Sequence, residues 1–155
     1  MPDIKMVLAS PCGPGRLSVR VCFRLSLFKE GLMHTQNLVL VVDDDPGMLR
    51  SVARLLRQFG YASLLFPSAE AFTNHTDFGD AICGLFDINL GDGSGIELRQ
   101  RLKAANISMP VIFRTGNDTP ANRTAAHQSG CLAYLTKPFS ALSLIEPLAR
   151  ASASR

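Results

Sequence analysis

The sequence predicts an α/β fold, a doubly wound parallel sheet of five strands. From residue 37 onward, short apolar runs alternate with amphipathic segments at helical spacing, which is typical of repeated β–α units. Acidic, hydroxyl and basic residues directly follow four of these runs, and an open parallel sheet binds its ligands at such strand ends. With 155 residues, 46% of them hydrophobic, the chain is long enough to bury the core of one domain.

The first β–α unit has the clearest pattern. Its strand, residues 38–42, is apolar throughout, as expected for a strand with helices on both faces. Asp45 and Pro46 then predict a helix start, because Asp is a favoured N-cap and proline suits the first turn. The helix is expected to end at Gly60. Its predicted inward stripe consists of Met48, Val52, Leu55, Leu56 and Phe59.

The other four units repeat the pattern. Their strands are expected at residues 62–66, 81–86, 111–114 and 132–136. Their helices are expected after Ser68, at about 94–105, from Pro120 to about Gly130, and from Ser140. The side chains predicted to face inward from the third and last helices are Leu98, Leu102, Ala105, Leu142, Ile145 and Leu148.

Residues 1–36 contain several prolines and glycines and no sustained period. We expect a poorly ordered N-terminal extension there, with Met33 as a candidate translation start, and one domain over 37–152. The net charge of +3 belongs to this extension: it holds five of the 16 basic and two of the 13 acidic residues, which leaves eleven of each. A neutral domain argues against direct nucleic-acid binding. Only residues 151–155 follow the last predicted helix, too few for a helix-turn-helix module.

Other classes of protein find little support in the sequence. No apolar run approaches the ~18 residues that span a bilayer, so we expect no membrane association and a cytoplasmic protein. The four cysteines show no C-x-x-C spacing, which argues against a zinc site or a disulfide framework. Cys83 and Cys131 are expected to be small buried residues. The three histidines, His34, His75 and His127, are scattered and expected to be solvated.

Five polar residues at strand ends carry the functional prediction. Asp43 and Asp44 follow the first strand, Asp87 the third, Thr115 the fourth and Lys137 the fifth. Together they predict a cage for a divalent cation, Mg²⁺ or Mn²⁺, and a phosphoryl group. The cation would relieve repulsion between the carboxylates and let one of them attack a phosphoryl donor. Lys137 would hold a phosphoryl oxygen as a point charge, and Thr115 would offer a hydroxyl.

Four stretches in this order resemble a known family. They are VVDDD at 41–45, FDINL at 86–90, RTG at 114–116 and YLTKPF at 134–139. Over about 37–150, the chain resembles the response regulator receiver domain of two-component signalling, in a single-domain form. The resemblance implies a flavodoxin-like sheet with strand order 2-1-3-4-5.

The resemblance also implies roles for individual residues at the strand ends. Asp87 would be the phosphoacceptor, charged by a histidine kinase or a phosphotransfer protein. Asp43 and Asp44 would hold the magnesium ion, and the backbone carbonyl of Asn89 would complete the set of protein ligands. Thus the implied protein is a signalling switch, which catalyses only its own phosphorylation and dephosphorylation.

The remaining implied roles concern the switch. Thr115 and Lys137 would grip the phosphoryl group, and Tyr134 would swing inward as Thr115 moves. The bond between Lys137 and Pro138 would be cis, as in the family. The signal would pass to an unknown downstream protein from the surface formed by the fourth helix, fifth strand and fifth helix, which is also a possible homodimer face.

An enzyme of another class remains an alternative. A magnesium-dependent phosphatase of the haloacid dehalogenase type also uses a strand-end aspartate, and residues 43–45 mimic its D-x-D element. That family normally has a longer chain and a different lysine context. Turnover of a phosphomonoester would favour the phosphatase, whereas stoichiometric labelling of Asp87 would favour the receiver.

Overall fold

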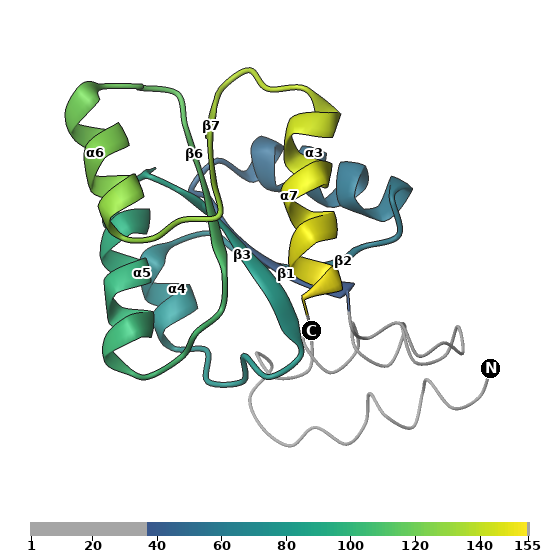
Figure 1. Ribbon diagram of the computed structural model, residues 1–155, viewed down its shortest axis with the longest axis horizontal. Helices are drawn as coiled ribbons and strands as arrows, with labels where there is room; N and C mark the ends of the chain where they lie inside the picture. Colours follow the sequence, from purple (N-terminus) through teal and green to yellow (C-terminus); the bar gives the residue numbers. More distant parts are fainter. Residues whose placement is uncertain (1–36, 155) are drawn as a thin grey trace. The chain divides into compact units, whose positions relative to one another are not determined.

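The computed structural model describes residues 37–154, and the predicted extension, 1–36, lies outside the described residues. Five parallel strands form one sheet in the order β2-β1-β3-β6-β7 (Figure 1). The strands are β1 (Leu38–Val42), β2 (Ala62–Phe66), β3 (Ala81–Asp87), β6 (Val111–Thr115) and β7 (Ala133–Thr136). Because β6 and β7 are the fourth and fifth strands of this sheet, the predicted order 2-1-3-4-5 is confirmed.

Helices cover both faces of the sheet. The helices α3 (Pro46–Gln58) and α7 (Ala141–Ala153) lie on one face (Figure 1). The helices α4 (Ala69–Thr73), α5 (Gly95–Ala104) and α6 (Pro120–Gln128) lie on the other. Each helix begins after a polar residue whose side chain accepts a hydrogen bond from a backbone N–H of the first turn. These N-caps are Asp45, Ser68, Ser94, Thr119 and Ser140.

One cluster of the core lies between the sheet and the helices α3 and α7, and two inward predictions there are wrong. Phe59 is 45% exposed and Leu142 is 61% exposed. Leu49 and Leu144 are buried in the core cluster instead. The reason is helical phase: in α7 the buried positions 144, 148 and 151 are spaced by four and three residues, and 142 lies off that stripe. Ala105, also predicted to face inward, is exposed as the C-cap residue of α5.

A small hairpin directly after β3 was not predicted. Its strands are β4 (Asn89–Leu90) and β5 (Gly93–Ser94), and they pair in antiparallel fashion. The backbone N–H of Gly95 then donates to the carbonyl of Ile88 at 3.1 Å, which closes the loop at the start of α5. The hairpin therefore fixes the chain on the carboxyl side of Asp87.

The prediction of a solvated His75 is wrong. His75 is 6% exposed, and the centre of its ring lies 5.1 Å from the ring centres of both Phe66 and Phe78. Among the cysteines, Cys83 is fully buried as predicted, whereas Cys131 is only partly buried. Within the described part of the chain, no helix combines the length and the apolar character needed to cross a bilayer.

Candidate functional site

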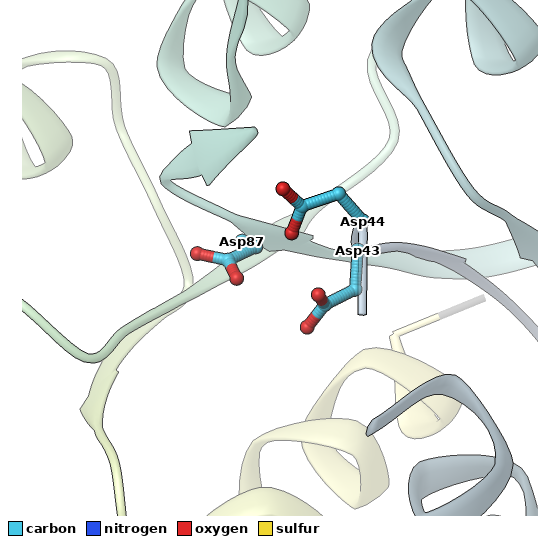
Figure 2. A group of neighbouring side chains, drawn as sticks. All are labelled: Asp43, Asp44 and Asp87. Atoms are coloured by element: carbon cyan, nitrogen blue, oxygen red, sulfur yellow. The ribbon is translucent and has the colours of Figure 1, made fainter. Parts of the chain in front are cut away.

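Three carboxylates meet at the carboxyl edge of the sheet. Asp43 and Asp44 follow β1, and Asp87 is the last residue of the neighbouring strand β3 (Figure 2). One oxygen from each lies within 4.8 Å of the others. Asp43 is fully buried and Asp87 is 5% exposed, whereas Asp44 is exposed. We call these three residues the acidic cluster.

Lys137 joins the acidic cluster from β7's end. Its Nζ donates to Oδ2 of Asp87 at 2.9 Å and lies 3.7 Å from Oδ2 of Asp43. The side chain passes beside Gly116, where a Cβ would lie 3.8 Å from Cδ of Lys137. The peptide bond from Lys137 to Pro138 is cis. One ammonium group thus lies between two of the carboxylates.

The surroundings of Asp87 perturb its ionisation. Burial raises the pKa of Asp87 above its ordinary value, since a charged carboxylate loses its water there. Lys137 and the N–H of Asn89, which donates to Asp87 Oδ1 at 3.1 Å, act in the opposite direction. The negative charge of Asp43 adds to the upward shift. A cation at this edge would therefore favour the ionised form of Asp87.

Arg114 is a site residue that the sequence reasoning missed. It lies in the interior strand β6, opposite Asp87 in the register, and its side chain is completely buried. Its Nη2 donates to Oδ2 of Asp43 in a buried ion pair. The signal was present: a charged residue in an otherwise apolar, buried strand needs a buried partner.

Thr115 is buried at the end of β6, one residue beyond the level of Asp87. Its hydroxyl is engaged within its own loop. Oγ1 of Thr115 accepts a hydrogen bond from the N–H of Asn117 at 2.9 Å. The same hydroxyl donates to the carbonyl oxygen of Asn117 at 3.1 Å. The structure thus brings Thr115 to the correct edge with its hydroxyl turned to the loop.

Tyr134 lies on β7, and its hydroxyl group is held at the surface. It donates to Oδ1 of Asp118 at 3.0 Å, and the same carboxylate pairs with Arg123. The guanidinium of Arg123 lies 5.7 Å from the centre of the Tyr134 ring, and the His127 ring stacks on it at 6.1 Å. Burial and the Asp118 hydrogen bond raise the pKa of Tyr134.

Two residues of the loop region support Asp87 and its surroundings. A Cβ on Gly95 would lie 2.4 Å from the carbonyl oxygen of Asp87, so only glycine allows α5 to start so close to β3. Asp92 accepts hydrogen bonds from the N–H groups of Ala69 and Glu70, both at 3.0 Å. These bonds lower the pKa of Asp92 and tie the hairpin to α4.

The donor set of the acidic cluster fits a magnesium ion. Mg²⁺ prefers oxygen ligands and is usually held by one or two carboxylates, with waters or phosphate oxygens completing the shell. The carboxylates of Asp43, Asp44 and Asp87 offer such oxygens at one edge, and the chain at Asn89 runs beside them. Histidine and cysteine, which suit zinc, do not take part in this cluster of described residues.

Comparison with known proteins decides the family. The family model of the response regulator receiver domain matches residues 39–149, which is most of the chain. The chain belongs to the response regulator receiver domain family. The comparison does not support the alternative, a phosphatase of the haloacid dehalogenase type. The match to the receiver family runs from strand β1 to strand β7 of the sheet and includes all three carboxylates.

Relatives and solved structures agree with this assignment. The transcriptional regulatory protein FixJ of Rhizobium meliloti is 32% identical over 120 residues, 76% of this chain and 58% of that protein. Nodulation protein W of Bradyrhizobium diazoefficiens is 31% identical over 118 residues, 76% and 52% of the two chains. The BeF₃-activated receiver domain of DrrB, from Thermotoga maritima, is 28% identical, with a TM-score of 0.66 and coverage of 76% and 97%. This receiver domain spans about half the length of the curated relatives it matches.

Proposed function

We propose that this receiver domain accepts a phosphoryl group on Asp87 from a histidine kinase or a phosphotransfer protein. The observation that carries the proposal is the arrangement around this carboxylate. Asp87 lies beside two further carboxylates, with the Lys137 ammonium 2.9 Å from its Oδ2. Such a site combines a nucleophilic oxygen with the charges that a transferring phosphoryl group requires.

In the proposed reaction, an oxygen of Asp87 forms a bond to phosphorus while the bond from phosphorus to the donor's nitrogen breaks. Asp43, Asp44, Asp87 and the carbonyl of Asn89 would hold Mg²⁺, which would supply positive charge to offset the negative charge of the phosphoryl oxygens. Lys137 holds one of these oxygens, because its Nζ already contacts Asp87 Oδ2.

The proposed output is a shift between two conformations. The phosphoryl group adds charge and acceptor oxygens at Asp87, so Thr115 exchanges its bond to Asn117 for a bond to the new group. Tyr134 then leaves Asp118 and turns inward. Reversing a 1:99 population requires about 5.5 kcal/mol, which a few charge-assisted hydrogen bonds of ~1.5–3 kcal/mol can supply.

The proposed docking surface for the downstream protein consists of α6, β7 and α7. Tyr134 is on this surface, and α7 adds the exposed apolar side chain of Leu142, which is 61% exposed. Repacking of Tyr134 would change this surface directly. The same face is our candidate for a homodimer contact.

Beryllofluoride, which activates the related DrrB receiver, tests the proposal. We expect the domain to bind one equivalent only with Mg²⁺ present, as measured by fluorine NMR. Asp87→Asn should abolish this binding while its circular dichroism spectrum stays unchanged, because the amide cannot replace the attacking carboxylate. Equal binding by Asp87→Asn would refute Asp87 as the phosphoacceptor.

A further inference from the structure

Arg114 is the one arginine of the described residues whose side chain is completely buried. It lies two residues after Ile112 in β6, so it points to the same face of the sheet as this core residue, the face under α3 and α7. A charged group is costly to bury, and arginine keeps its charge at any physiological pH. Burial of the Arg114 guanidinium therefore requires compensation by an anion.

The compensation comes from the acidic cluster. Nη2 of Arg114 pairs with Oδ2 of Asp43, whereas Nε and Nη1 have no hydrogen-bond partner among the described residues. Oδ1 of Asp43 accepts from the N–H of Asp45 at 2.8 Å. Both oxygens of Asp43 are therefore engaged by donors of the protein itself.

Arg114 changes the net charge of the acidic cluster and its surroundings. Three carboxylates and Lys137 alone would carry a formal charge of −2. Arg114 reduces this charge to −1. A divalent cation is attracted by net negative charge, so a built-in positive charge beside Asp43 opposes its binding. The same positive charge holds the buried Asp43 in place without any metal.

We propose that Arg114 is an internal counter-cation of the acidic cluster, which lowers the affinity of the receiver domain for Mg²⁺ and stabilises its metal-free form. This inference rests on the proposed function, because it concerns the same magnesium and phosphoryl site. Arg114 acts through Asp43 and is a positioning residue. The domain would thus bind Mg²⁺ mainly when a phosphoryl donor brings additional negative charge to the site.

The test is calorimetric titration of the metal-free domain with MgCl₂. Arg114→Gln keeps a donor for Asp43 but removes the charge, and we expect it to bind Mg²⁺ at least about tenfold more tightly than the unchanged domain. Arg114→Lys keeps the charge and should stay within about threefold of the unchanged domain. Arg99→Gln is the matched control, since Arg99 donates to the carbonyl of Met109 and should leave Mg²⁺ affinity unchanged.

Thermal unfolding gives a second readout. Without Mg²⁺, Arg114→Gln should unfold at a lower temperature, because Asp43 is left buried with less compensation. Saturating Mg²⁺ should raise its midpoint by more than it raises that of the unchanged domain. If Arg114→Gln does not fold at all, Arg114→Met takes its place, because it fills similar space without a charge and leaves all three carboxylates in position. It should also bind Mg²⁺ at least about tenfold more tightly than the unchanged domain.

The possible results separate this inference from the proposed function. Equal Mg²⁺ affinity of Arg114→Gln and the unchanged domain would overturn the role of Arg114 and leave the phosphoacceptor proposal intact. Equal tightening in Arg114→Lys and Arg114→Gln would also overturn it, since lost packing rather than lost charge would then be the cause. Absence of Mg²⁺ binding in all variants would refute the magnesium site itself.

Discussion

At the scale of single residues, Lys137 connects the acidic cluster to the last strand of the sheet. Its ammonium contacts Asp87 at 2.9 Å and Asp43 at 3.7 Å, and its side chain is 22% exposed. The exposure leaves room for the ammonium to follow a new anion. A charge-assisted hydrogen bond of this kind contributes more than a neutral one.

Replacing Lys137 should separate phosphorylation from signalling. We expect Lys137→Ala to accept phosphoryl groups from acetyl phosphate about 10- to 100-fold more slowly, the equivalent of one charge-assisted hydrogen bond. Once phosphorylated, the variant should show little change in the NMR signals of Tyr134. Lys103→Ala is the control, because Lys103 only approaches the carbonyl of Ser129, at 3.4 Å. A normal response of Tyr134 in Lys137→Ala would count against the gripping role.

At the scale of elements, the loop from β6 to α6 holds Tyr134 at the surface. Asp118 of this loop accepts from the Tyr134 hydroxyl, and Arg123 in α6 fixes Asp118. The loop that follows Thr115 and the strand that contains Tyr134 are therefore linked by one carboxylate. Movement of the loop would release the tyrosine.

The two tyrosines of the chain make this link measurable. Burial raises the pKa of both Tyr134 and Tyr61, but Asp118 raises only that of Tyr134. Asp118→Ala should lower the pKa of Tyr134 toward its ordinary value, because the carboxylate favours the protonated phenol. The ultraviolet absorbance of tyrosinate, measured against pH, should show the Tyr134 transition of Asp118→Ala at a lower pH than in the unchanged domain. The Tyr61 transition should stay in place and serves as the internal control.

Arg123→Ala should have the opposite effect on this titration. The guanidinium favours the phenolate form of Tyr134, so its loss should raise the pKa of that side chain. If both variants titrate like the unchanged domain, the surface position of Tyr134 does not depend on Asp118.

The start of α5 limits the space around Asp87. Gly95→Ala would place a Cβ 2.4 Å from the Asp87 carbonyl oxygen, and the backbone must shift to accept it. We expect a loss of about 1–3 kcal/mol in the free energy of urea unfolding, together with slower phosphorylation. Gly93→Ala is the matched control, because its Cβ would meet its nearest neighbour, Ala69, at an ordinary 3.5 Å. Equal stability of the two variants would contradict the close approach.

At the scale of the whole molecule, the sequence predicts the main sheet well. The strands β1 and β2 have the predicted bounds, because short apolar runs between helix caps and glycines leave little freedom. The convergence of Asp43, Asp44, Asp87 and Lys137 also follows from the strand order, since adjacent parallel strands end at the same edge.

What the sequence reasoning missed depends on contacts rather than on patterns. The hairpin of β4 and β5 has two-residue strands, which are too short to show a period. Arg114 stood in a run assigned to the core, and its partner Asp43 follows a strand two places away in the sheet, so the pair is seen only in the folded structure. Leu142 has the right chemistry for the core and the wrong helical phase.

One measurement tests the central claim of phosphorylation at Asp87 most directly. The unchanged domain is incubated with acetyl phosphate and Mg²⁺, digested and mapped by mass spectrometry. We predict one phosphoryl group per chain, located on Asp87, and none when Mg²⁺ is removed with a chelator. A phosphoryl group on another residue, or none in the presence of Mg²⁺, would contradict the account.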